Sequence, residues 1–208
     1  MLLLVISVSA RFEPYAMNGG SVVAVAGRGF AVVAADRMLV EGYSLRSSTD
    51  RLTVVGDACV ACAGSQADSR GLVEVVCAEA RRYEWLASRK LGAEAVAHLV
   101  ALALYSRRGF PYLAQTVVAG CDGVYTFDSL GSFARVDAAA TGAAQRILQP
   151  ILDDLCADSR SDPDDALALV ERAFQAALRR DVALGATLDV VVLRPSRPPE
   201  HRQLQLGG

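Results

Sequence analysis

Two cysteines three residues apart, Cys59 and Cys62, form the one CxxC motif of the chain, a spacing that can serve zinc binding or redox chemistry. They lie in the apolar run 58–63 (ACVACA), which predicts a β-strand. Side chains three positions apart on a strand point to opposite faces, so the two thiols cannot share a metal ion. The two histidines, His98 and His201, lack ligand spacing, and we expect neither a metal site nor a cofactor.

The composition excludes several classes of function. Just over half of the 208 residues are hydrophobic (52%), 21% are charged, and the formal net charge is −2. A chain with this balance is globular, and it lacks the basic excess of a nucleic-acid or membrane-surface binder. Its five cysteines are odd in number and irregularly spaced, unlike a secreted disulfide framework. We therefore expect no nucleic-acid partner and no membrane partner.

The first ten residues (MLLLVISVSA) form a short apolar segment. A signal peptide has a positive charge at its start, and these residues have none. They are also too short to span a bilayer, which takes about 20 residues. We interpret residues 1–19 as an N-terminal extension or the remnant of a pro-segment. Because no repeat or linker divides the remainder, residues 20–208 are interpreted as a single domain.

The elements expected to position any site come in blocks. Strands are predicted at 21–27, 30–35, 43–46, 52–55, 58–63, 113–119, 124–127 and 188–193. Helices are predicted from Ser65, over 93–105, over 142–156 and from Pro163. Since strands and helices come in blocks and do not alternate, we expect an α+β fold in which two packed sheets have helices outside.

Local signals refine this outline. Arg28-Gly29 and Asp122-Gly123 predict hairpin turns, and Ser65 with Asp68 resembles a capping box. The helix over 93–105 is apolar nearly all round, which predicts burial on most sides, and His98 within it is expected to be a buried packing residue. The segment from Pro195 onward is interpreted as a polar tail.

Five strings along the chain carry a resemblance to a known family. They are RFEPYAMNGGS (11–21), AADRMLVEGYS (34–44), LYSRRGFPY (104–112), FDSLGSF (127–133) and LQPILD (148–153). In this order they resemble the proteasome β subunits of the N-terminal-nucleophile hydrolase superfamily, in particular the subunit at the sixth position of the eukaryotic β ring. The resemblance runs from about Arg11 to Pro195. It implies a four-layer αββα sandwich of two antiparallel sheets flanked by helices.

The resemblance also implies where a catalytic site would lie. Active members expose an N-terminal threonine whose hydroxyl attacks the substrate and whose freed amine acts as the base. A lysine, two aspartates and serine hydroxyls support it. The nucleophile position falls on Gly20, the first aspartate on Asp36 and the lysine on Arg51. The second aspartate falls on Asp181, and the two serines fall on Ala143 and Leu184.

The residues at these positions predict an inactive site. Gly20 has no side chain to attack with, and Arg51 stays charged and cannot accept a proton. Lys90, the one lysine of the chain, follows a predicted helix far from the site. The two aspartates are retained, and we expect them to bond backbone amides and turns. One alternative is an active amidase that uses Ser21 after cleavage at Gly20-Ser21, but Ser21 is displaced by one strand position and should point to the opposite face.

The predicted function is therefore that of a non-catalytic structural β subunit of the 20S proteasome core particle. By resemblance its partners are the other α and β subunits of a stacked-ring hetero-oligomer and unfolded polypeptides in the chamber, and its place is cytoplasmic and nuclear. The turn with Asp122 matches the segment that reaches the substrate channel of the neighbouring active subunit. Asp122 is thus either a channel residue, a hairpin residue, or both. A stand-alone binding domain of the same fold is the remaining alternative.

Overall fold

The computed structural model describes residues 17–41, 44–47, 50–155 and 161–207. Its strands are β1 (Ser21–Ala26), β2 (Ala31–Asp36), β3 (Met38–Glu41), β4 (Ser44–Ser47), β5 (Leu52–Val55), β6 (Ala58–Gly64), β7 (Ala114–Gly120), β8 (Gly123–Phe127), β9 (Phe133–Val136), β10 (Ala138–Gly142), β11 (Thr187–Leu193) and β12 (Glu200–Gln205). Its helices are α1 (Gln66–Ala87), α2 (Ala93–Ser106), α3 (Gln145–Leu155) and α4 (Pro163–Leu178).

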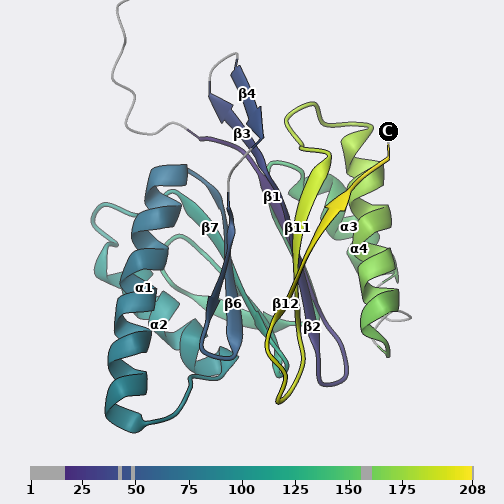
Figure 1. Ribbon diagram of the computed structural model, residues 1–208. Helices are drawn as coiled ribbons and strands as arrows, with labels where there is room; N and C mark the ends of the chain where they lie inside the picture. The colour runs from purple at the N-terminus through teal and green to yellow at the C-terminus, as the bar shows by residue number, and fades with distance from the viewer. Residues whose placement is uncertain (1–16, 42–43, 48–49, 156–160, 208) are drawn as a thin grey trace, which may run out of the picture.

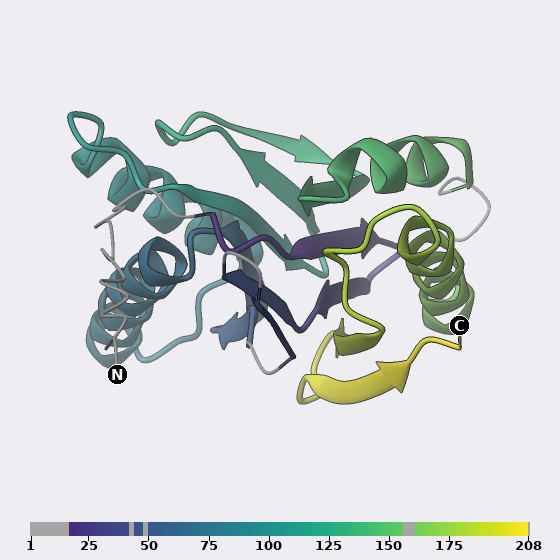
Figure 2. The ribbon, with the colours of Figure 1, turned by 90° about the horizontal axis from the view of Figure 1, so that it is seen from above.

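Two antiparallel five-stranded sheets lie face to face. The first has the order β10-β1-β2-β11-β12 and the second the order β5-β6-β7-β8-β9, while β3 and β4 form a separate hairpin. Helices α1 and α2 cover the outer face of the second sheet, and α3 and α4 that of the first (Figure 1). The view from above shows the same four layers (Figure 2). The predicted αββα sandwich is confirmed.

Strand residues alternate between the layers of this sandwich. In β1, Val22 and Ala24 pack between the sheets, whereas Val23 and Val25 pack under α3 and α4. Both faces of the strand are covered, and so every residue of β1 and β2 is buried. The same alternation places Cys59 between the sheets and Cys62 under α1 and α2, which confirms that the two thiols point to opposite faces.

The two predicted hairpin turns are confirmed, but four strands of the described residues were not predicted. Gly29 has a positive φ of 79° in the turn between β1 and β2, and β7 joins β8 through Cys121 and Asp122. The unpredicted strands are β3, β9, β10 and β12. The expected polar tail was wrong: it contains β12, an edge strand whose outward side chains are exposed and therefore polar. Helix α3 begins at Gln145 and not at 142, since 138–142 forms β10.

Helix α1 is capped by a distant segment. Ser65 stands at the N-cap, but its side chain makes no capping hydrogen bond. The Asp68 carboxylate instead accepts the Leu113 amide at 2.8 Å, so the predicted capping box was wrong. The carboxamide oxygen of Asn18 accepts the Gln66 amide at 3.0 Å and thereby caps the helix from outside. The cap of α4 is local, with the Asp162 side chain accepting the Asp164 amide at 2.8 Å.

Helix α2 is buried on one side only, which corrects the prediction of burial on most sides. Val96, Val100 and Leu104 pack on the second sheet. Leu102 is 66% exposed, and His98, expected to be buried, is exposed with its ring against Phe133. An all-round apolar pattern is therefore no proof of burial within one chain. None of the helices within the described ranges is long and apolar enough to cross a membrane.

Candidate functional site

Gly20 precedes β1 at the end of the first sheet, where its backbone has a positive φ of 84°. Its carbonyl accepts the Ala143 amide at 2.9 Å. A Cβ atom built at Gly20 would lie 2.0 Å from Cζ of Arg51 and 2.3 Å from its Nε and Nη2 atoms. The space in which a side chain of residue 20 would begin is therefore filled by the Arg51 guanidinium.

Arg51 comes from the start of the second sheet and is only 5% exposed. Its Nε donates to the backbone oxygen of Asp36 at 3.1 Å, and its Nη2 donates to the backbone oxygen of Met38. Nε also lies 3.7 Å from Oδ1 of Asp36, an ion pair with both side chains buried. Burial lowers the pKa of Arg51 and the Asp36 carboxylate raises it. The guanidinium is held at three points on the β2–β3 segment.

The Asp36 carboxylate is fully buried and surrounded by backbone amides. Oδ1 accepts the Ser21 amide at 2.6 Å, and Oδ2 accepts the amides of Met38 at 3.2 Å and Gly185 at 3.0 Å. Burial raises the pKa of Asp36 above its ordinary value, even though these amides and Arg51 act in the opposite direction. The carboxylate joins three backbone segments, which is a structural arrangement.

Ser21 lies on the other side of β1. Its side chain has the same parity as Val23, which packs under α3 and α4, and its hydroxyl oxygen accepts the Ala144 amide at 2.9 Å. Ser21 is fully buried. The hydroxyl is therefore directed away from Arg51 and into the helix layer, as the strand parity predicts.

The other predicted site positions do not join this group through side chains. Ala143 reaches Gly20 through its backbone amide only. Asp181 accepts the Ala183 amide at 2.9 Å within its own turn, and Leu184 is buried in the core beneath α4. Gly185, the residue after Leu184, provides the contact to Asp36. Met38 and Gly185 were missed because they contribute backbone groups, which every residue type offers.

The residues that precede Gly20 are hydrogen-bonded to two neighbouring strands. The backbone amide of Asn18 donates to the Gly64 oxygen at 3.0 Å, and its backbone oxygen accepts the Val40 amide at 3.0 Å. Its side-chain nitrogen donates to the Val40 oxygen at 3.3 Å, and the Gly19 oxygen accepts the Gly64 amide at 3.2 Å. Residues 17–19 thus lie between β3 and the end of β6, hydrogen-bonded to both.

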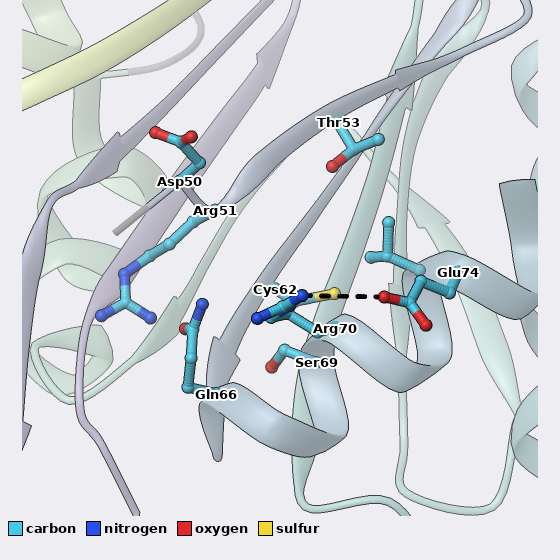
Figure 3. Close-up of a pocket in the computed structure, with 9 residues that line it drawn as sticks. Asp50, Arg51, Thr53, Cys62, Gln66, Ser69, Arg70 and Glu74 are labelled. Atoms are coloured by element: carbon cyan, nitrogen blue, oxygen red, sulfur yellow. Dashed lines mark ion pairs between the residues drawn. The ribbon is translucent and has the colours of Figure 1, made fainter. Parts of the chain in front are cut away.

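A small cavity of about 170 Å³ adjoins Arg51 on the α1 side (Figure 3). It is lined by Asp50, Arg51, Thr53, Cys62, Gln66, Ser69, Arg70, Val73 and Glu74. Cys62 Sγ lies 3.6 Å from Oγ1 of Thr116, and burial raises the pKa of this thiol to about 11. The protonated thiol is no nucleophile at neutral pH. Within the described ranges, no three His, Cys, Asp or Glu side chains are grouped as metal ligands.

Asp122 lies at the opposite end of the second sheet, where turns meet α2. Its Oδ2 accepts the Glu94 amide at the start of α2 at 3.3 Å and lies 3.4 Å from the Tyr125 hydroxyl. Its backbone oxygen accepts a hydrogen bond from Arg135. The side chain is exposed and lines an open cavity of about 700 Å³ that faces the loop 194–199. Asp122 therefore braces a helix in addition to forming a turn.

Comparison with known proteins gives one consistent result. The family model described as "Proteasome: Proteasome subunit" matches residues 16–193. The zebrafish protein "Proteasome subunit beta type-1" is 34% identical over 201 residues, covering 89% of this chain and 85% of its own. The Petunia hybrida protein of the same name is 32% identical, with 90% and 92% covered. "Probable proteasome subunit beta type-6" of Schizosaccharomyces pombe is 38% identical over 152 residues, with 70% and 68% covered.

Proposed function

Because the chain belongs to the proteasome subunit family, we propose that it is a non-catalytic β subunit of the 20S core particle, of the type at the sixth ring position. The observation that carries the absence of catalysis is the Arg51 guanidinium, which fills the place of a nucleophile's side chain beside Gly20. Residue 20 has no side-chain hydroxyl, thiol or amine to attack a peptide bond. Asp36 is engaged by backbone amides.

In this role the chain contributes structure. Its partners are the other α and β subunits of the stacked rings, and its surface forms part of the chamber wall that unfolded polypeptides meet. The particle acts in the cytoplasm and the nucleus. Residues 1–19, of which 1–16 lie outside the described residues, serve as an N-terminal extension or are the remnant of a pro-segment, and Asn18 links β3 to β6.

The alternative of an amidase that uses Ser21 has little support. The Ser21 hydroxyl is buried in the helix layer, and its backbone amide donates to Asp36 within the sheet. Cleavage at Gly20-Ser21 would also release Gly20, whose carbonyl holds Ala143.

Native mass spectrometry of material from the source cells tests the proposal. We expect the chain in a particle of several hundred kilodaltons together with other α-like and β-like chains. A covalent inhibitor directed at N-terminal threonines should label other chains of that particle and leave this one unmodified. A chain that begins at Ser21 and carries the inhibitor would refute the absence of catalysis, whereas a monomeric chain would refute the subunit role.

A further inference from the structure

The Arg51 guanidinium occupies the space of any side chain at residue 20, and the absence of catalysis alone does not require this. An inactive site needs only a residue 20 that cannot attack, and an alanine would serve. Here even a methyl group would collide with the guanidinium, with three of its atoms within 2.3 Å. Real Cβ contacts do not approach so closely, so either the guanidinium or the backbone would have to move.

The guanidinium cannot move at little cost. Its hydrogen bonds to the backbone oxygens of Asp36 and Met38 would break, and the buried Asp36 carboxylate would lose its cation. Removing one partner from a buried ion pair is costly because a charge is left uncompensated. An exposed arginine could swing its guanidinium away to relieve such a clash, whereas Arg51 is held in place.

We propose that Arg51 is a plug, a side chain that takes the volume of the absent residue 20 side chain and holds the β2–β3 segment in its place. Gly20 and Arg51 then depend on each other: the positive φ already favours glycine at 20, and Arg51 in addition leaves no space for any side chain there. The site is closed twice, once by the missing nucleophile and once by the plug. This inference concerns the fold of the chain and holds whether or not the chain enters the particle.

Gly19 provides a matched control. Its φ is 71°, close to the 84° of Gly20, so alanine suffers similar backbone strain at both positions. A Cβ at Gly19 would meet only the Val40 side chain, at 3.4 Å and beyond, an ordinary contact. The difference between Gly20→Ala and Gly19→Ala therefore isolates the collision with Arg51 from the strain of a left-handed backbone.

The test combines each alanine with changes at residue 51. Gly20→Ala and Gly19→Ala are made in the natural chain, in Arg51→Ala, which clears the volume, and in Arg51→Lys, which keeps a cation near Asp36 without the planar fork. Each full-length variant is co-expressed with a tagged natural chain, and mass spectrometry measures the ratio in which the two enter the particle. The thermal unfolding midpoint of each chain is measured in parallel.

In the natural background, we expect Gly20→Ala to enter the particle about tenfold less than Gly19→Ala, a coupling typical of residues in contact. In the Arg51→Ala background, the entry of Gly20→Ala and of Gly19→Ala should agree within about twofold. In the Arg51→Lys background, the difference in entry should be intermediate. An equal gap in every background, or no gap in any, would overturn the plug. If Arg51→Ala fails to accumulate, the Arg51→Lys series decides alone. If even the natural chain enters no particle, the subunit role fails, and the unfolding midpoints still test the plug.

Discussion

At the scale of single residues, the charged groups of the site are surrounded by backbone partners. Asp36 is saturated by the amides of Ser21, Met38 and Gly185, and Arg51 is held by backbone oxygens. Under the proposed function, these groups hold the backbone in place and are not directed at a reacting atom. The same residues that would support a nucleophile here join three segments of backbone.

Restoring the nucleophile alone should therefore not restore activity. Gly20→Thr adds a hydroxyl, but the serine positions hold Ala143 and Leu184, Arg51 replaces the lysine, and catalytic groups act as a unit. Because the collision with Arg51 should also reduce the entry of this variant, turnover is expressed per variant chain found in the particle, and we expect none above background. The measurement uses peptide hydrolysis in particles whose own threonine sites are inactivated, with the unaltered subunit as control. Threonine-type turnover from this one change would contradict the account.

The resemblance of a few strings pointed to Gly20, Asp36 and Arg51, and the structure brings these three residues together. The overlap of Arg51 with the missing side chain was not predictable. It depends on how a long side chain from one sheet crosses to a backbone position in the other. The contact between Gly185 and Asp36 was equally hidden, because an amide has no signature in the sequence.

At the scale of elements, the start of α1 shows why local patterns mislead. Ser65 and Asp68 have the spacing of a capping box, yet Asp68 turns to Leu113 and the cap comes from Asn18, 48 residues before Gln66. Strands β9, β10 and β12 escaped for a related reason. They are short or at sheet edges, where polar and small residues are tolerated and the alternation that marks a strand is weak.

Asn18 and Ser65 can be compared directly. Asn18→Ala should lower the free energy of unfolding by about 1 kcal/mol, the usual cost of removing a helix cap. Ser65→Ala should change it far less, since the Ser65 side chain makes no capping bond. Thermal unfolding gives the stability, and hydrogen exchange of the first-turn amides of α1 shows whether the loss begins there. A larger effect at Ser65 than at Asn18 would contradict the long-range cap.

At the scale of the whole molecule, the exposed apolar side chains lie mainly on the outer helices and loops. Trp85 is 81% exposed, Leu102 66% and Phe110 61%, and Leu86 and Tyr105 are also exposed. A stable monomer rarely leaves this many large apolar side chains in water, whereas a subunit covers them with its neighbours. Leu102 and Tyr105 lie on α2, which the sequence predicted to be buried on most sides, because a sequence does not distinguish burial within the chain from burial between chains.

The isolated chain should consequently fail to remain a monomer. At micromolar concentration we expect it to aggregate or to stay in an assembly intermediate, as measured by size-exclusion chromatography with light scattering. Leu102→Glu should reduce that self-association and also reduce entry into the particle. Glu79→Gln, an exposed polar change on α1, is the control and should alter neither. A soluble, stable natural monomer would count against the subunit interpretation.

Asp122 connects the chain to a site in its neighbour under the proposed function. Three roles are open to its carboxylate: a turn residue, a brace for α2 through the Glu94 amide, and an acidic group in the neighbouring substrate channel. Asp122→Asn keeps an oxygen that can accept the Glu94 amide and retains a residue favoured in turns, while it removes the charge. Asp122→Ala removes the brace as well. The pair therefore separates the charge from the structural roles.

If the carboxylate faces the channel, Asp122→Asn particles should assemble normally. They should show an altered preference at the chymotrypsin-like site, chiefly for peptides that differ a few residues before the cut. A basic side chain there should lose several-fold in kcat/KM relative to a neutral one, because a charge-assisted contact is lost. Asp122→Ala should in addition lower the thermal stability of the chain. Unchanged kinetics in Asp122→Asn across the peptide panel would leave Asp122 with the brace and the turn alone, since both survive in the asparagine variant.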